Sequence, residues 1–247
     1  MHKQARQNYI IEIIAKNGQV SVADLSNQLH VSTDTIRRDL TELENQGLAQ
    51  KNHGGAVGFN VPVMSRRGRN ILLPEVKKQL GQQVAKLIPK SSTLFLDSGS
   101  TVMAVASFIQ GPMKIITTSL DIAVHFSERA DIQLILLGGE WDSEQRLFAG
   151  SGTLSILARY RADIAILGAC ALHSTLGLSA TQEADCDVKR AMIANSQAHW
   201  VVADSTKLNL CQPYLVAHLD EIDQLFLDCH WDELNPSSKV IVNSLNI

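Results

Sequence analysis

The sequence predicts an α/β protein in which an N-terminal winged helix-turn-helix domain precedes a larger α/β domain with a mainly parallel sheet. Residues 3–58 show the order helix, helix, helix and hairpin, which is typical of a winged helix-turn-helix. From residue 74 onward, apolar strands alternate with amphipathic helices, which is typical of a parallel sheet covered by helices. We therefore expect domains over 3–58 and 74–247, joined by a linker over 59–73.

The composition is that of a globular protein, because 45% of the 247 residues are hydrophobic and 19% are charged. Aromatic residues make up 5%, which argues against a stacking surface for single-stranded nucleic acid. The N-terminus lacks the apolar run of a signal peptide, and the chain lacks the run of about 18 apolar residues that would span a membrane. A cytoplasmic protein that does not enter the membrane is expected.

The cysteines predict reduced thiols rather than disulfides or zinc ligands. They lie 16, 25 and 18 residues apart, without a CxxC pair. No metal site and no cofactor is expected. The four residues are Cys170, Cys186, Cys211 and Cys229.

The net charge of −3 does not by itself indicate a nucleic-acid partner. Residues 1–57 hold equal numbers of acidic and basic side chains, and the excess of acid lies in the rest of the chain. There is no basic tail. Any DNA binding must therefore depend on where a few cations are placed.

Three N-terminal helices are predicted from apolar spacing and capping residues. Residues 3–16 carry apolar side chains at steps of four, and Gly18 ends this pattern. Ser21 is expected to cap a second helix through Leu29. Ser32 is expected to cap a third helix that ends near residue 46, and two short strands around "NHGG" form the wing.

The third helix has an arginine pair on its outer side. Ile36, Leu40 and Leu43 face inward at spacings of four and three, so Arg37 and Arg38 project outward. Two interpretations compete, because charge pairs usually face water. The alternative is that the pair reads DNA, since arginine makes bidentate contacts to guanine.

The surrounding residues fit the DNA interpretation. Thr33 and Thr35 lie in the first turn of the helix, the end that enters a major groove in this architecture. The wing offers Lys51 and His53 to the DNA backbone. Asp39 is unusual, because an acid near phosphates is repelled. We hypothesise that it pairs with a nearby arginine such as Arg6 and holds the helix in place.

Residues 3–58 resemble the DNA-binding domain of the DeoR family of bacterial transcription regulators. The resemblance is carried by "TIRRDL" at 35–40, by "VSVADLSNQLHVS" before it, by "NHGGAV" after it and by Arg6-x3-Ile10 at the front. It favours the reading of DNA over a solvated arginine pair. The implied DNA-binding residues are Ser32, Thr33, Thr35, Arg37, Arg38, Lys51 and His53.

The linker "GFNVPVMSRRGRNILL" holds three arginines in four positions. A solvated connector and a contact to phosphate both remain open as interpretations. DeoR-type proteins often carry an Arg, Asn, Lys pattern here. By resemblance, Arg66, Asn70 and Lys77 are its counterparts, with a longer gap before the lysine.

The second domain is predicted as a series of strands and helices that alternate along the chain. The strands are expected at 93–97, 114–117, 132–137, 163–168, 199–203 and 222–227, with "SKVIVN" last. The helices are expected at 74–88, 101–110, 119–129, near 151–159 and at 183–197.

Several loops that follow these strands are rich in small and hydroxyl residues. They are "DSGST" (97–101), "TTSL" (117–120), "LGGE" (137–140) and "ADSTKL", which contains Lys207. A single loop of this kind is usually a cap or a turn. Three or more at strand ends indicate a ligand site, because ligands of such sheets bind beyond the carboxyl ends of the strands.

The same loops resemble the effector domain of the DeoR family, which is similar in fold to ribose-5-phosphate isomerase and related phosphosugar-binding proteins. The resemblance extends to "TQEADCDVKRAMI" (181–193), which places Glu183 and Lys189 at family positions. Two segments depart from the family: Thr118 replaces a usual asparagine, and "GACALHSTLGLSA" replaces "GID…G". The implied effector-binding residues are Asp97, Ser98, Gly99, Ser100, Thr101, Thr118, Ser119, Gly138, Glu183 and Lys207.

Together these features predict a DNA-binding transcription regulator, most simply a repressor of a carbohydrate operon that a phosphorylated sugar relieves. Its expected partners are a double-stranded operator and a second copy or more of itself, as a homodimer or homotetramer. An isomerase-like enzyme is the alternative, with Asp97, Glu183 and Lys207 as acid/base groups. The N-terminal domain argues against it, as it does against a scaffold without catalytic or regulatory function.

Overall fold

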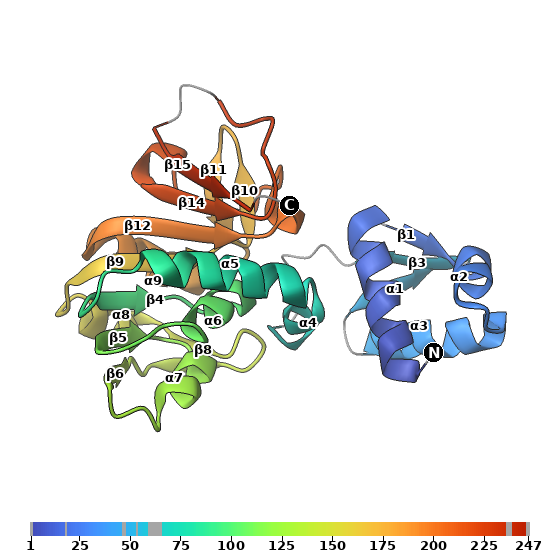
Figure 1. Cartoon of the computed structure of the whole chain (residues 1–247), viewed down its shortest axis with the longest axis horizontal. Helices are drawn as coiled ribbons and strands as arrows, with labels where there is room; N and C mark the ends of the chain where they lie inside the picture. Colours follow the sequence, from blue (N-terminus) through green and yellow to red (C-terminus); the bar gives the residue numbers. More distant parts are fainter. Residues whose placement is uncertain are drawn as a thin grey trace. The chain divides into compact units, whose positions relative to one another are not determined.

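The computed structural model describes residues 2–17, 19–45, 48–52, 54–58, 66–235 and 239–245. The chain divides into two compact units, Met1–Pro74 and Glu75–Ile247 (Figure 1). None of the helices in these described stretches is long and apolar enough to cross a membrane.

The first unit is the predicted winged helix-turn-helix. Its three main helices are α1 (Lys3–Asn17), α2 (Val22–Leu29) and α3 (Thr33–Asn45). The strands β1 (Gln19–Ser21), β2 (Ala49–Asn52) and β3 (Gly55–Gly58) form an antiparallel sheet in the order β1-β3-β2. The predicted hairpin is β2–β3, and β1 adds a third strand that pairs with β3.

Two serines begin the helices of the helix-turn-helix, as predicted. Ser21 Oγ accepts a hydrogen bond from Asp24 N at 3.0 Å and caps α2. Ser32 Oγ accepts one from Thr35 N at 3.2 Å at the start of α3. Each hydroxyl satisfies a backbone N–H that lacks a partner in the first helical turn. His30, at φ 53°, makes the turn between the helices.

A buried ion pair joins α1 to α3 inside this unit. Arg6 Nε lies 2.5 Å from Asp39 Oδ2, and Arg6 Nη2 lies 3.2 Å from Asp39 Oδ1. Both residues are buried beside a core that includes Ile10, Ile36 and Leu40. The hydrogen bond with Asp39 raises the pKa of the Arg6 guanidinium. The hypothesis that Asp39 pairs with Arg6 is confirmed.

A short helix lies within the stretch predicted as a linker. It is α4 (Arg66–Ile71), in which Arg66 Nη1 donates a hydrogen bond to Asn70 Oδ1 one turn later. Leu72 after it is buried with the core of the first unit. Ile71, the last residue of α4, packs against the same core.

The second unit contains a seven-stranded, fully parallel sheet in the order β15-β14-β12-β9-β4-β5-β6. Its strands are β4 (Thr93–Leu96), β5 (Met113–Thr117), β6 (Ile132–Leu136), β9 (Ala162–Gly168), β12 (Ser196–Ala203), β14 (Gln224–Leu227) and β15 (Ile241–Ser244). Its helices are α5 (Pro74–Leu87), α6 (Ser100–Ala106), α7 (Leu120–Phe126), α8 (Ser151–Leu157) and α9 (Glu183–Ala194). Figure 1 shows the sheet and these helices.

Helices cover both faces of this sheet. Leu94 and Leu96 of β4 point into a core with residues of α5, α6 and α7. Phe95 between them points to the other side, into a core with residues of α8 and α9. Burial on both faces explains why the strands are apolar throughout rather than alternating.

The structure corrects the sequence prediction in several segments. The helix predicted to reach 197 ends at Ala194, and β12 begins at Ser196, where it first pairs with Ala162 of β9. Short antiparallel strands were not predicted, because three or four residues carry no clear alternation. They are β7 (Glu140–Asp142) with β8 (Leu147–Ala149), and β10 (Ala171–His173) with β11 (Gly177–Ala180) and β13 (Tyr214–Ala217).

Replacing Asp39 by asparagine should destabilise the first unit by about 3 kcal/mol or more, because it leaves the Arg6 charge buried without its partner. Calorimetry of the full chain measures this as a lowered unfolding transition of that unit. Asp34→Asn is the control, because Asp34 forms an ion pair with Arg38 whose side chains are both exposed. Equal transitions for the two variants would contradict the role assigned to Asp39.

Candidate DNA interface and effector site

The exposed face of α3 carries the predicted DNA-binding residues. Thr33, Arg37 and Arg38 are exposed, and Thr35 is half-buried. Ser32 is exposed but engaged locally, since its hydroxyl caps α3 and lies 2.9 Å from Thr35 Oγ1. The face is thus a stripe of hydroxyl and guanidinium groups on a helix whose other side is held in the core.

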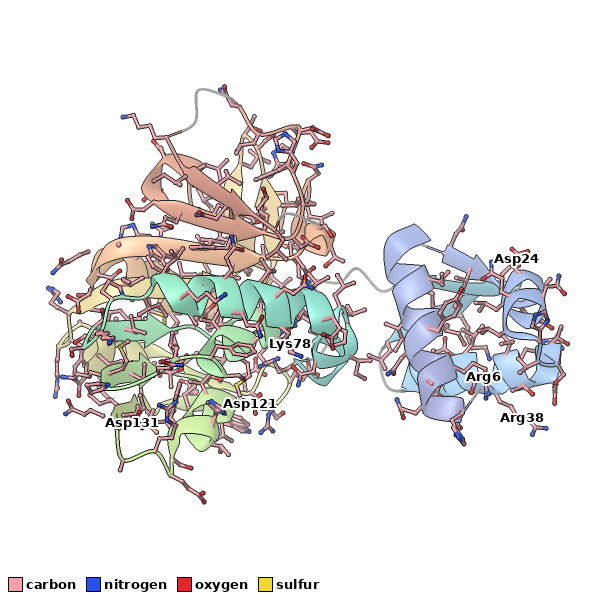
Figure 2. All side chains as sticks on the ribbon, in the orientation of Figure 1. Arg6, Asp24, Arg38, Lys78, Asp121 and Asp131 are labelled. Carbon is pink, nitrogen blue, oxygen red and sulfur yellow. The ribbon has the colours of Figure 1, made fainter. Side chains whose placement is uncertain are left out.

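The two arginines of this stripe differ in their surroundings. The Arg37 guanidinium forms no hydrogen bond or ion pair with any residue in the described stretches. Arg38 Nη2 lies 3.0 Å from Asp34 Oδ2, one turn earlier on α3. Figure 2 shows Arg38 on the outer side of α3, whereas Arg6 lies between α1 and α3. Among the described residues, the Arg37 guanidinium is therefore without a partner and the Arg38 guanidinium has one.

The wing contributes one described cation. Lys51 is exposed, and its ammonium donates to Thr41 Oγ1 of α3 at 2.9 Å. Its backbone N–H donates to Glu44 Oε1 at 3.0 Å, which ties β2 to the end of α3. His53, the other predicted wing residue, lies outside the described residues.

A buried charge cluster lies where β4 ends in the second unit. Asp97 follows β4 and is fully buried, and its Oδ2 accepts from Gly168 N at 2.9 Å and from Lys189 Nζ at 2.5 Å. Lys189 Nζ also lies 3.0 Å from Asp185 Oδ1, one turn earlier on α9. The cluster joins the loop after β4, the end of β9 and α9.

Burial and neighbouring charges oppose each other in this cluster. Burial by itself would lower the pKa of Lys189, but the carboxylates of Asp185 and Asp97 raise it, so the ammonium stays charged. Burial raises the pKa of the Asp97 carboxyl, against the opposing effect of Lys189. One cation thus faces two buried acids.

In this cluster and in the loop after β5, three buried polar atoms lack a hydrogen-bond partner among the described residues. They are Asp97 Oδ1, Thr118 Oγ1 and Asp185 Oδ1, of which the last still has its ion pair with Lys189. A buried acceptor or hydroxyl without a hydrogen bond lowers the stability of the fold. Asp97 Oδ1 and Thr118 Oγ1 are therefore expected to bind a polar ligand or a water molecule.

The loop between Asp97 and α6 is the accessible part of the site. Ser98 and Thr101 are mostly buried, whereas Gly99 and Ser100 are partly exposed. Gly99 adopts φ 135°, and a side chain added there would meet no atom within 4 Å. The space beside the Gly99 Cα is therefore open.

The loop after β5 is tied to the strand beside it. Thr117 Oγ1 donates to Leu96 O at 2.6 Å, and Ser119 Oγ caps α7 by accepting from Ile122 N. Thr118 O accepts from Phe148 N at 2.9 Å, which joins the β7–β8 hairpin to this loop. Gly138 is exposed, and its carbonyl accepts from Thr153 Oγ1 at 2.8 Å.

A second group of charges lies beyond β12 and β14. Asp228 accepts from Ser205 N at 2.6 Å and from Ser205 Oγ at 3.0 Å. Asp204 caps the short 3-10 helix η2 (Ser205–Lys207), and Lys207 is buried at its end. Burial raises the pKa of the Asp228 carboxyl. Lys207 thus lies at the edge of the sheet where it was predicted. Asp204 and Asp228, which were not predicted as site residues, lie at the same edge.

The sequence pattern contained signals for the residues that were missed. Asp228 ends "QLFLD" as Asp97 ends "TLFLD", so the two acids follow similar buried strands. Asp185 lies three and seven residues before the buried Val188 and Met192, which places it on the inward face of α9. Glu183, the acid that was predicted, is the exposed first residue of that helix.

The edge of the sheet thus combines buried acids with a partly exposed loop of small residues. Carboxylates accept hydrogen bonds from hydroxyl groups, while backbone N–H groups and hydroxyls suit phosphate oxygens. In the described stretches no group of three His, Cys, Asp or Glu side chains is arranged to hold a metal ion. The chemistry suits a small, hydroxylated anion.

Replacing Lys189 by methionine should destabilise the second unit by about 3–5 kcal/mol at neutral pH, because two carboxylates then remain buried without a cation. Without Lys189 the pKa of the Asp97 carboxyl rises further above that of the unfolded chain, so the loss of stability is largest at high pH and shrinks as pH falls. Thermal unfolding of the full chain at several pH values measures it. Lys78→Met, which removes an exposed lysine near Glu75, is the control; a loss independent of pH would contradict the ionic role.

Comparison with known proteins identifies both units. Residues 6–60 match the family described as "DeoR-like helix-turn-helix domain", and residues 74–229 match "DeoR C terminal sensor domain". The glycerol-3-phosphate regulon repressor of Escherichia coli K12 is 33% identical over 234 residues, which cover 92% of each chain. The HTH-type transcriptional repressor GlcR of Bacillus subtilis is 32% identical over 231 residues, covering 92% of this chain and 89% of that protein.

Among solved structures, ribose 5-phosphate isomerase A from Methanocaldococcus jannaschii is 19% identical and covers 55% of this chain and 54% of its own, with a TM-score of 0.39. That likeness is too distant to support an argument. The two family matches together span most of the sequence, and the relatives are similar along nearly their whole length. The chain belongs to the DeoR family of transcription regulators.

Proposed function

We propose that the protein is a sequence-specific DNA-binding repressor whose release from DNA is triggered by a phosphorylated small sugar or polyol. The observation that carries the DNA-binding part is the outer face of α3, where Arg37 has no partner among the described residues. An uncommitted guanidinium on a helix of this type is available for the edge of a guanine.

The effector proposal rests on the edge of the parallel sheet. Gly99 and Ser100 offer backbone N–H groups and a hydroxyl to a phosphate, and Asp97 Oδ1 offers an acceptor to a sugar hydroxyl. Lys207 supplies a cation after β12, at the same edge of the sheet. A similar repressor is named for a glycerol-3-phosphate regulon, so glycerol 3-phosphate belongs among the first ligands to test.

We propose that the protein acts as a homodimer or homotetramer. Each chain contains one α3, and a helix-turn-helix that reads a two-fold operator needs a second recognition helix one DNA turn away. Sedimentation with and without operator DNA tests this.

The alternative, an isomerase-like enzyme, requires acid/base groups that face one substrate. Asp97 is buried against Lys189, while Glu183 is exposed at the start of α9. This arrangement favours a binding role over catalysis. Turnover of pentose or hexose phosphates by the purified protein would restore the enzyme alternative.

Replacing Arg37 by alanine should weaken binding to a cognate operator by about 1–3 kcal/mol and flatten the preference at one base position. Lys51→Ala should weaken binding to all sequences alike and reduce its salt dependence. Fluorescence anisotropy with duplexes chosen from a randomised library measures both. Arg159→Ala removes an exposed arginine from the other unit and is the matched control. Wild-type affinity and selectivity of the Arg37 variant would contradict its assignment.

Replacing Ser100 by alanine together with Thr101 by valine should leave operator binding intact and abolish its release by sugar phosphates. Coupling between effector and operator typically amounts to about 1–3 kcal/mol, so loss of the phosphate contacts leaves a repressor that stays bound. Operator release and thermal shift with glycerol 3-phosphate, glucose 6-phosphate and ribose 5-phosphate measure this.

Ser107→Ala is the matched control for that variant, because Ser107 lies at the opposite end of α6, where its hydroxyl donates to Met103 O. It should respond to effector as the wild type does. If the Ser100/Thr101 variant responded equally well, the effector site would have to lie elsewhere on the unit.

A further inference from the structure

The helix α3 carries one acid, Asp34, that does not contact the rest of the first unit in the described residues. The other described acids of α3 bind residues from outside the helix. Asp39 pairs with Arg6, and Glu42 binds Lys3 and Gln7 of α1. Glu44 accepts a hydrogen bond from Lys51 N of β2. Asp34 differs from them. Its side chain is 67% exposed, and its ion-pair partner is Arg38, which is 81% exposed.

An acid at this place is unfavourable for DNA binding unless it has a specific task. Asp34 lies in the first turn of α3, the part of such a helix that enters the major groove. A carboxylate there is repelled by the phosphates on both sides of the groove. Stabilisation of the helix dipole is available to an acid in the first turn of any helix, so it does not explain why the acid faces an arginine.

The geometry points to a task for Asp34. A guanidinium has five N–H donors, and Asp34 Oδ2 occupies one of them, on Nη2. Another N–H on Nη2 and those on Nη1 remain for the O6 and N7 acceptors of guanine. Fixing a long side chain before binding reduces the entropy that it loses on the DNA, which favours the base that matches its donors.

We propose that Asp34 is a positioning residue that holds Arg38 in the geometry for reading a guanine, so that Arg38 discriminates more sharply than the untethered Arg37. The proposal rests on the proposed function, because it assumes that α3 reads DNA. It assigns different tasks to two adjacent arginines: Arg38 is oriented by the carboxylate, and Arg37 adapts to the base it meets.

The test uses the full-length protein and a library of randomised DNA duplexes, from which bound sequences are recovered and counted. Wild-type protein should select a motif with a strong guanine position. Arg38→Ala should reduce the guanine preference at that position by about tenfold or more, as expected for one lost bidentate contact. Asp34→Ala should reduce the preference at the same position several-fold and leave the other positions unchanged.

Two further variants separate positioning from a general effect of charge or folding. Asp34→Ala combined with Arg38→Ala should match Arg38→Ala alone, because the acid acts only through the arginine. Glu75→Ala is the matched control: Glu75 is an exposed acid in the first turn of α5 with Lys78 3.8 Å away, and its loss should not change the motif. Thermal unfolding establishes that each variant is folded, and Asp34→Asn, which keeps the side-chain size, replaces Asp34→Ala if that variant does not fold.

The outcomes are distinct. An unchanged motif for folded Asp34→Ala, or for Arg38→Ala, would overturn the proposal. So would loss of a cytosine position with the guanine retained, because Asp34 would then read a base directly. If wild-type protein recovered no motif at all, the proposed DNA-binding function itself would fail, before the role of Asp34 is reached.

Discussion

The Lys189 ammonium between the carboxylates of Asp97 and Asp185 is the interaction on which the edge of the parallel sheet depends. These groups come from the end of β4 and from α9, segments far apart in the sequence. A buried acid is tolerated only when a cation or hydrogen-bond donors compensate it. The cluster therefore fixes the loop after β4 at the same point where the accessible Gly99 and Ser100 begin.

The winged-helix unit is also held by a buried ion pair. Arg6 and Asp39 form the buried pair that joins α1 to α3, and surrounding polar contacts extend it to Gln7 and Glu42. The inner side of α3 is held by both apolar and ionic contacts, and most of its predicted DNA-binding residues lie exposed on the outer side. The hydroxyl and guanidinium groups on that side are thus available to contact DNA. DNA binding through these groups does not require a net positive charge on the domain.

Much of the fold was predictable from the sequence. Ser21 and Ser32 begin the helices predicted for them, and the alternation of strands and helices from residue 74 predicts the parallel sheet. The short strands β7, β8, β10, β11 and β13 were not predictable, because segments of three or four residues take their conformation from the partners that they meet. The pairing of Arg6 with Asp39 was foreseen only as a hypothesis, since chemistry suggested that the acid needs a cation but could not choose which one.

The sequence by itself determined the types of group at the candidate sites: an arginine pair on a short amphipathic helix, and small polar loops after apolar strands. Local spacing and capping chemistry are enough for that, because they act within a few residues along the chain. The tertiary structure alone decided how those groups are used. It brings Asp97 to Lys189, 92 residues later in the chain, and it selects Asp185 rather than Glu183 for the buried cluster. The reason is physical: burial and the approach of distant charges set the state of each side chain, and both arise only when the chain folds.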